Sequence, residues 1–276
     1  MKPDSPDFPK NENHTLTSLL PSALGLFDMD TFHARIPVLF LDFDGTLAPI
    51  VSNPEDARLT VEMTEVLANL LKRHTCVILT GRDRADIEKR IDLPGIIFAG
   101  SHGYEIKGRE LEWIYEDGLA SIAALDDAQK NLEAILSEEA GVVIERKKFA
   151  IAVHYRHVKE EREQVVVDKI QRVIERYKSH LKPGPGKKVL ELKPNCEWNK
   201  GKALEWLMNR MNFDLNRYLP VFIGDDLTDE DGFAVVRENG IGIIVSDDPE
   251  RYSQACYSLS AINEVYDFLH KLSQSE

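Results

Sequence analysis

The stretch Pro37-Val-Leu-Phe-Leu41, followed directly by Asp42-Phe43-Asp44-Gly45-Thr46, decides the fold of this chain. A short continuous apolar run suits a strand that is buried on both faces of a parallel sheet. Alternation along such a strand places Asp42 and Asp44 on the same side, at the carboxyl end of the sheet, where α/β proteins bind their ligands. Gly45 allows the backbone to turn there. One carboxylate can act as a nucleophile while its neighbour transfers a proton, but an isolated Asp-x-Asp is equally typical of a plain strand-to-turn junction.

Similar apolar runs recur along the chain, with helical patterns between them. Apolar residues repeat at helical spacing from Met63 to Leu71, a helix is expected over Arg82–Ile91, and Thr228 is predicted to cap a helix that stops near Gly240. Strands that alternate with helices imply right-handed crossovers and a doubly wound, Rossmann-like parallel-sheet α/β core. Its other strands are expected at Cys76–Leu79, Ile96–Ala99, Pro220–Ile223 and Ile241–Val245.

The middle of the chain has a different pattern, which predicts an inserted α+β domain over residues 108–194. Its order, strand-helix-strand-strand-helix-strand, is typical of a small, largely antiparallel sheet with helices on one face. The stretch Lys182–Lys187 is expected to be a loop within it. The insert divides the core into residues 21–107 and 195–276, and residues 1–20 are expected to form a flexible tail. The predicted strands of the insert are Leu111–Tyr115, Val142–Glu145, Phe149–Tyr155 and Lys188–Leu192.

The composition excludes several classes of partner. The chain has 276 residues and a formal net charge of −13, which argues against a nucleic acid or an anionic membrane as partner, because both are held mainly by Lys and Arg. Its three widely spaced cysteines fit neither a zinc site nor a disulfide framework, so a reduced, cytoplasmic protein is expected. No apolar run approaches the length of a membrane span.

Three further polar motifs follow predicted strands or begin predicted helices. The hydroxyl and amides of Thr80-Gly81-Arg82 can hold phosphate oxygens, although the same residues can serve as an ordinary helix start. The carboxylates of Gly224-Asp225-Asp226 suit an oxygen-liganded Mg²⁺, although a solvated acidic turn is the alternative. Lys200 can neutralise a phosphate, whereas most lysines are simply solvated. Together these motifs would surround one edge of the sheet, which predicts hydrolysis of a phosphate monoester.

These motifs resemble the four signature motifs of the haloacid dehalogenase-like phosphatases, and the resemblance narrows to the trehalose-6-phosphate phosphatase family. It covers residues 37–270, and one departure is Thr80, where that family usually has serine. The matching segments are Leu41–Val51, Ala99–Glu105, Val153–Arg156, Lys188–Pro194, Glu197–Gly201 and Gly224–Asp231.

The resemblance implies a Mg²⁺-dependent hydrolase that converts trehalose-6-phosphate to trehalose and phosphate. It implies Asp42 as nucleophile, Asp44 as general acid and base, and Mg²⁺ held by Asp42, Asp225 and the main-chain carbonyl of Asp44. Asp226 and Asp229 would then lie behind these ligands or provide an alternative one. Thr80 and Lys200 would hold the phosphate, with Gly81 and Arg82 beside them.

The insert would be the family's cap, with Arg156, Lys188 and Glu191 facing the sugar, while Lys187 competes with Lys188 for that role. His102 is expected to line the cleft. Two other functions stay open at this point: a phosphatase of another glycosyl phosphate, such as a glucosylglycerol or glycerate derivative, and a phospho-receiver domain. A receiver would need neither Asp44 nor an insert of this size. The substrate partner expected is a small sugar phosphate, and the sequence leaves the oligomeric state open.

Overall fold

The computed structural model describes residues 14–29, 32, 34–51, 53–184 and 188–275. It divides the chain into two compact units, residues 1–112 with 198–276, and residues 113–197. Lys187 and most of the predicted tail lie outside the described residues. Each unit has its own sheet and its own apolar core.

The larger unit is built on a sheet whose described strands follow the order β14-β12-β11-β2-β3-β4-β5-β6. From β14 to β4 neighbouring strands are parallel, and β5 is antiparallel to β4. The parallel α/β core predicted from the sequence is therefore confirmed. The strands are β2 (Ile36–Leu41), β3 (Thr75–Leu79), β4 (Ile97–Gly100), β5 (Glu105–Gly108), β6 (Leu111–Ile114), β11 (Tyr218–Gly224), β12 (Ile241–Val245) and β14 (Tyr257–Leu259).

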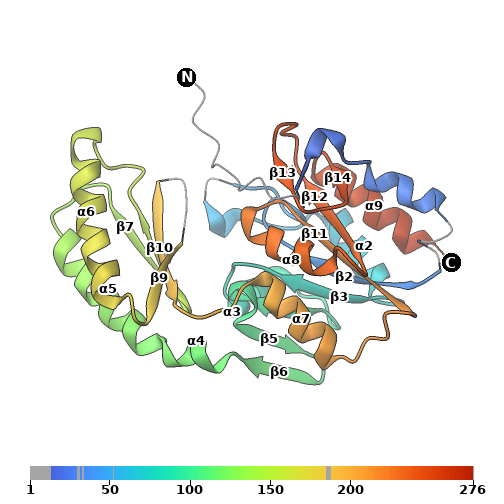
Figure 1. The fold of residues 1–276 in the computed structure, drawn as a ribbon, viewed down its shortest axis with the longest axis horizontal. Helices are drawn as coiled ribbons and strands as arrows, with labels where there is room; N and C mark the ends of the chain where they lie inside the picture. The colour runs from blue at the N-terminus through green and yellow to red at the C-terminus, as the bar shows by residue number, and fades with distance from the viewer. Residues whose placement is uncertain (1–13, 30–31, 33, 52, 185–187, 276) are drawn as a thin grey trace. The chain divides into compact units, whose positions relative to one another are not determined.

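Alternate strand residues point to opposite faces of this sheet, and helices pack on both faces. On one face, Leu39, Leu41 and Ile78 belong to the core cluster that also takes buried residues from α2 (Val61–Leu70), α3 (Arg84–Arg90) and α9 (Ile262–Gln274). On the other, the ring of Phe222 packs 5.3 Å from that of Phe233 on α8 (Glu230–Val236), and α7 (Lys200–Arg210) packs beside α8. Figure 1 shows α2 beside α9 and α7 beside α8.

The smaller unit has a sheet of described strands in the order β7-β8-β10-β9, all antiparallel. Ile151, Val153 and Leu192 point to the face covered by α5 and α6, whereas Ala152 and Glu191 are paired residues that alternate to the other face. The elements are α4 (Glu116–Ala120), α5 (Ile122–Leu136), β7 (Val143–Lys147), β8 (Ala150–His154), α6 (Glu160–Tyr177), β9 (Leu181–Gly184) and β10 (Val189–Pro194).

Two strand assignments from the sequence were wrong. The segment predicted as the insert's first strand is β6, which joins the edge of the larger sheet. Part of the predicted Lys182–Lys187 loop is β9, in which Pro183 lies opposite Leu192. A proline is tolerated there because β9 is an edge strand, in which a residue without a main-chain N–H can face away from the sheet.

The start of the described chain and one helix cap also differ from expectation. Thr15–Leu16 form a strand, β1, that pairs with β13 (Tyr252–Ser253), so this part of the predicted tail belongs to a sheet. The helix predicted to be capped by Thr228 is α8, whose N-cap residue is Asp229 and which has no side-chain cap within the described part of the chain. Asp226 instead caps the preceding turn Leu227–Asp229: its carboxylate accepts the Leu227 amide, and the Asp229 carboxylate accepts the Asp226 amide.

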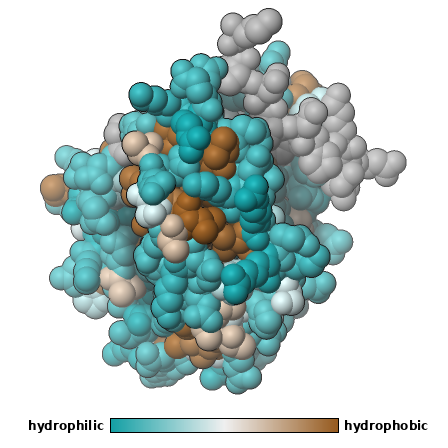
Figure 2. All heavy atoms as spheres, turned by 90° about the vertical axis from the view of Figure 1, so that its left-hand side faces the viewer, coloured by the Kyte–Doolittle hydropathy of each residue, from teal (hydrophilic) through white to brown (hydrophobic). Residues whose placement is uncertain are grey.

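The molecular surface is largely hydrophilic on the face in Figure 2, with apolar groups gathered near its middle. Among the described residues, no helix combines the length and apolar character needed to cross a bilayer.

Candidate active site

The predicted catalytic residues of the larger unit converge at the carboxyl ends of its parallel strands. Asp42 follows β2, Thr80 follows β3 and Asp225 follows β11, and these three strands are neighbours in the sheet. Lys200 is the first residue of α7, whose start is fixed by the Asn199 side chain accepting the Lys202 amide. The sheet order and the start of α7 thus bring the four motifs to the carboxyl edge of the parallel sheet.

Lys200 is buried, and its ammonium group joins two carboxylates. Nζ donates to Oδ1 of Asp42 at 2.9 Å and to Oδ1 of Asp229 at 2.7 Å. Lys200 and Asp42 are only 2% and 4% exposed, and Asp229 is fully buried, so these charges interact with little screening by water.

Asp229 organises the loop after β11. Its Oδ2 accepts the main-chain amides of Asp225 and Asp226 at 3.0 and 2.9 Å, while its Oδ1 binds Lys200. Both oxygens are therefore engaged by the protein. The carboxylate of Asp225 is less engaged than that of Asp229: its Oδ1 accepts a hydrogen bond from Thr46 Oγ1 at 3.1 Å.

Gly45 is required where β2 meets this loop. Its φ of +85° is a left-handed conformation, and a Cβ added there would lie 2.1 Å from Oδ2 of Asp225. Any other residue would displace the Asp225 carboxylate.

The charges of this cluster do not balance. Burial and the nearby Asp229 and Asp225 raise the pKa of Asp42 well above its usual range, although Lys200 opposes the change. Burial and Asp229 likewise raise the pKa of Asp225 to about 7. Burial disfavours the charged form of Lys200, but Asp229 and Asp42 outweigh it and raise the pKa of Lys200. One ammonium faces three carboxylates, so the site favours a further cation.

Carboxylate oxygens of Asp42, Asp225 and Asp229 lie within 4.8 Å of one another. An all-oxygen donor set suits a hard divalent cation. Since both oxygens of Asp229 are already engaged, Asp42 and Asp225 fit the role of ligands better. The residues present therefore fit a metal ion.

The residues of the Thr80-Gly81-Arg82 segment have different surroundings. Thr80 is 1% exposed and its Oγ1 accepts the Arg82 amide at 3.2 Å. The ring of His102 lies close over Gly81, where a Cβ would be 2.9 Å from Cε1. Thr80, Gly81 and His102 are thus adjacent, and the His102 amide donates to the Thr80 carbonyl at 2.8 Å.

Arg82, however, binds Asp44. Its Nε and Nη2 each lie 2.7 Å from one carboxylate oxygen of Asp44, and Nη1 donates to Asp86 at 3.0 Å. Asp86 in turn accepts from Arg90, which is 4% exposed at its side chain. The Arg82 donors are largely used within the protein, which sequence reasoning did not foresee.

The predicted sugar-binding residues lie in the smaller unit. Glu191 on β10 is 3.7 Å from Nζ of Lys147, a partner that the sequence did not suggest. Lys188, with φ of +60°, forms an ion pair with Glu163, and its carbonyl accepts the Tyr155 amide. Arg156 is exposed in the turn after β8.

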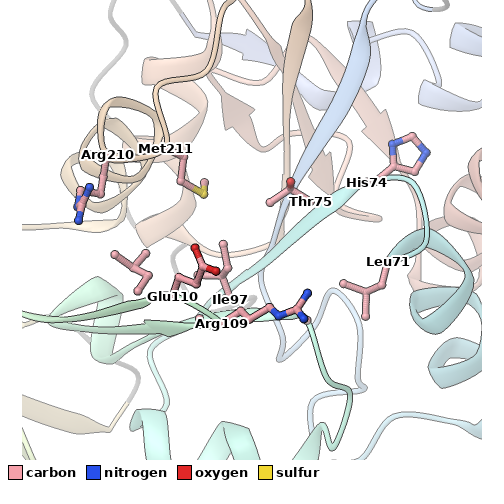
Figure 3. A pocket seen from close by; sticks show the side chains of 11 residues that line it. Leu71, His74, Thr75, Ile97, Arg109, Glu110, Arg210 and Met211 are labelled. Carbon is pink, nitrogen blue, oxygen red and sulfur yellow. The ribbon is translucent and has the colours of Figure 1, made fainter.

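A separate hollow of about 530 Å³ lies in the larger unit at the opposite, amino-terminal edge of the sheet (Figure 3). Thr75 and Ile97 begin β3 and β4, and both line it. None of the residues predicted to act on phosphate is among those that line it.

The sheet order and the carboxylate–lysine cluster define an α/β protein with an acidic site at the carboxyl ends of its parallel strands. The trehalose-phosphatase family model matches residues 40–262, and the chain belongs to that family.

Individual relatives agree. The chain is 37% identical to a probable trehalose-phosphate phosphatase D of Arabidopsis thaliana over 266 residues, covering 91% of this chain and 72% of that protein. It is 37% identical to a Mycobacterium tuberculosis trehalose-phosphate phosphatase, covering 93% of this chain and 66% of that protein. Among solved structures, the C-terminal domain of a C. albicans trehalose-6-phosphate phosphatase has a TM-score of 0.73 at 22% identity, covering 92% and 98% of the two chains.

Proposed function

We propose that this chain hydrolyses trehalose-6-phosphate in a Mg²⁺-dependent reaction that passes through a phosphorylated Asp42. The observation that carries the proposal is the buried Asp42 carboxylate, held by Lys200 at 2.9 Å and grouped with Asp225 at the carboxyl edge of the sheet. Membership of the trehalose-phosphatase family supports the choice of substrate.

In the first step a carboxylate oxygen of Asp42 attacks phosphorus, and the bond from phosphorus to the sugar oxygen breaks. Asp44 gives a proton to the departing oxygen. In the second step Asp44 takes a proton from water, the water oxygen attacks phosphorus, and the bond to Asp42 breaks. Lys200 keeps Asp42 oriented, and Thr80 and the Gly81 amide bind phosphate oxygens.

Mg²⁺, held by the carboxylates of Asp42 and Asp225 and the main-chain carbonyl of Asp44, would offset the negative charge that phosphate adds to this acidic site. In the smaller unit, Arg156, Lys188 and Glu191 are proposed to bind sugar hydroxyls, and in the larger unit His102 is proposed to contact the substrate.

A substrate panel tests the proposal. Phosphate release is measured from trehalose-6-phosphate, glucosylglycerol phosphate, glucosylglycerate phosphate and glucose-6-phosphate, with Mg²⁺ and with EDTA. We expect the largest kcat/KM for trehalose-6-phosphate and loss of turnover in EDTA. A higher kcat/KM for another glycosyl phosphate would make that compound the preferred substrate in place of trehalose-6-phosphate. Full activity in EDTA would mean that the reaction does not need a metal ion.

A further inference from the structure

The main-chain amide and the main-chain carbonyl of Asp225 are both held by side chains. Its amide donates to Asp229, and its carbonyl accepts from Nη1 of Arg251. The first contact comes from the loop itself. The second comes from the segment between β12 and β14, a part of the chain to which the proposed reaction gives no role.

The Arg251 side chain is mostly buried and lies beside an acidic side chain. It is 14% exposed, and Nη2 lies 3.5 Å from Oε1 of Glu230, the first residue of α8. The other oxygen of Glu230 accepts the Gln254 amide at 2.8 Å. Arg251 therefore connects the loop that carries Asp225 to the start of α8.

The beginning of the described chain holds the Arg251 segment in turn. The Thr17 amide donates to the Arg251 carbonyl at 2.8 Å, and β1 continues this pairing, with Leu16 opposite Tyr252 and Thr15 opposite Ser253. A chain of hydrogen bonds thus runs from the Thr17 amide to the Arg251 carbonyl, and from the Arg251 guanidinium group to the Asp225 carbonyl.

We propose that Arg251 is a positioning residue for the metal loop, and that the N-terminal strand β1 keeps it in place. This inference rests on the proposed metal-dependent reaction. A guanidinium group on the Asp225 carbonyl prevents the peptide from rotating, so the Asp225 carboxylate stays directed at Asp42. Groups that orient metal ligands in this way affect metal affinity although they do not touch the ion.

The test measures metal binding without substrate. Mn²⁺ is titrated into the full chain and free Mn²⁺ is followed by electron paramagnetic resonance. Arg251→Met keeps the apolar stem and removes the donors, and we expect the Mn²⁺ Kd to rise about 10- to 100-fold. Arg251→Lys, which keeps a donor, should fall between Arg251→Met and the unmodified protein. The matched control is Arg237→Ala, since Arg237 donates to the Gln254 carbonyl instead.

A second pair of variants tests the strand. Thr17→Pro removes the amide donor at the first residue of a 3₁₀ turn, and Leu16, with ψ of 136°, already has the extended conformation that precedes proline. Thr17→Val keeps the amide and is the control for the hydroxyl. Thr17→Pro should raise the Mn²⁺ Kd, with little further effect in the Arg251→Met background, whereas Thr17→Val should not.

The outcomes separate the two proposals. If the unmodified protein binds no Mn²⁺, the metal-dependent function fails. If it binds Mn²⁺ and folded Arg251→Met binds it equally well, the positioning role of Arg251 is wrong. Additive effects of Thr17→Pro and Arg251→Met would separate β1 from Arg251 and overturn the second half of the inference.

Discussion

Asp42 provides the most direct test at the scale of single residues. Asp42→Asn removes the proposed nucleophile but keeps the shape of the side chain, so we expect turnover of trehalose-6-phosphate to fall below detection. Circular dichroism should show an unchanged fold, because a neutral amide beside Lys200 relieves the crowding of carboxylates. Residual activity close to that of the unmodified protein would contradict a phospho-aspartate mechanism.

Arg82 gives a second prediction at this scale. Its two 2.7 Å contacts hold the Asp44 carboxylate, so Arg82→Met should leave the proposed general acid poorly placed. We expect kcat to fall about 100-fold or more for ethyl phosphate, whose leaving group needs a proton, and much less for para-nitrophenyl phosphate. Arg84→Met, which loses the ion pairs with Glu88 and Glu105, is the control, because among the described residues Arg84 has no hydrogen bond or ion pair with Asp44. Equal losses on both esters would assign Arg82 to phosphate binding instead.

The same two residues show what a sequence can and cannot tell. Asp42 could be predicted because a strand end fixes where a short side chain points. Arg82 could be located beside the site, but a long side chain with five donors reaches phosphate or carboxylate equally well. Only the tertiary position of Asp44 and Asp86 decides between them.

At the scale of elements, the turn after β2 depends on Gly45. Gly45→Ala places a methyl group 2.1 Å from Asp225 Oδ2 and forces a positive φ, so we expect the free energy of unfolding to fall by about 1–3 kcal/mol and Mn²⁺ binding to weaken. Urea unfolding and the Mn²⁺ titration measure the two effects. Gly25→Ala, where an added Cβ meets nothing within 4 Å, should change neither.

The strand β10 carries the prediction about specificity. Glu191 lies on the sheet face opposite α5 and α6, so its carboxylate is available to hydroxyl groups. Glu191→Ala should lower kcat/KM for trehalose-6-phosphate at least tenfold while para-nitrophenyl phosphate hydrolysis changes little, because a site built on hydrogen bonds loses discrimination when a partner is removed. Glu133→Ala on the exposed side of α5 is the control. Similar losses on both substrates would mean that Glu191 acts through folding.

Element boundaries were harder to predict than element types. The parallel strands were found because doubly buried strands give continuous apolar runs. β9 was missed because its Lys-Pro-Gly composition is typical of a loop, and it is a strand only because β10 supplies a partner. β6 was assigned to the insert because sequence order cannot say which sheet an edge strand joins.

At the scale of the whole molecule, each unit has apolar packing of its own among the described residues. The larger cluster of buried residues comes entirely from residues 23–98 and 219–272, and the smaller one from residues 125–192. The order of predicted strands and helices indicated two sheets, but the crossing points at 112–113 and 197–198 depend on pairings that appear only in the folded chain.

Two cores predict two thermal transitions in differential scanning calorimetry. The proposed metal ligands Asp42 and Asp225 belong to the larger unit, so Mg²⁺ at about 100 times its Kd should stabilise that transition by about 2.7 kcal/mol and leave the other in place. Ile151→Ala, which removes a fully buried side chain from the smaller core, should lower only the smaller unit's transition, by about 2–5 kcal/mol. Ile78→Ala is the matching change in the larger core. If Ile151→Ala and Mg²⁺ move one common transition, the two units unfold together, and a change in either core must then alter the stability of the metal site.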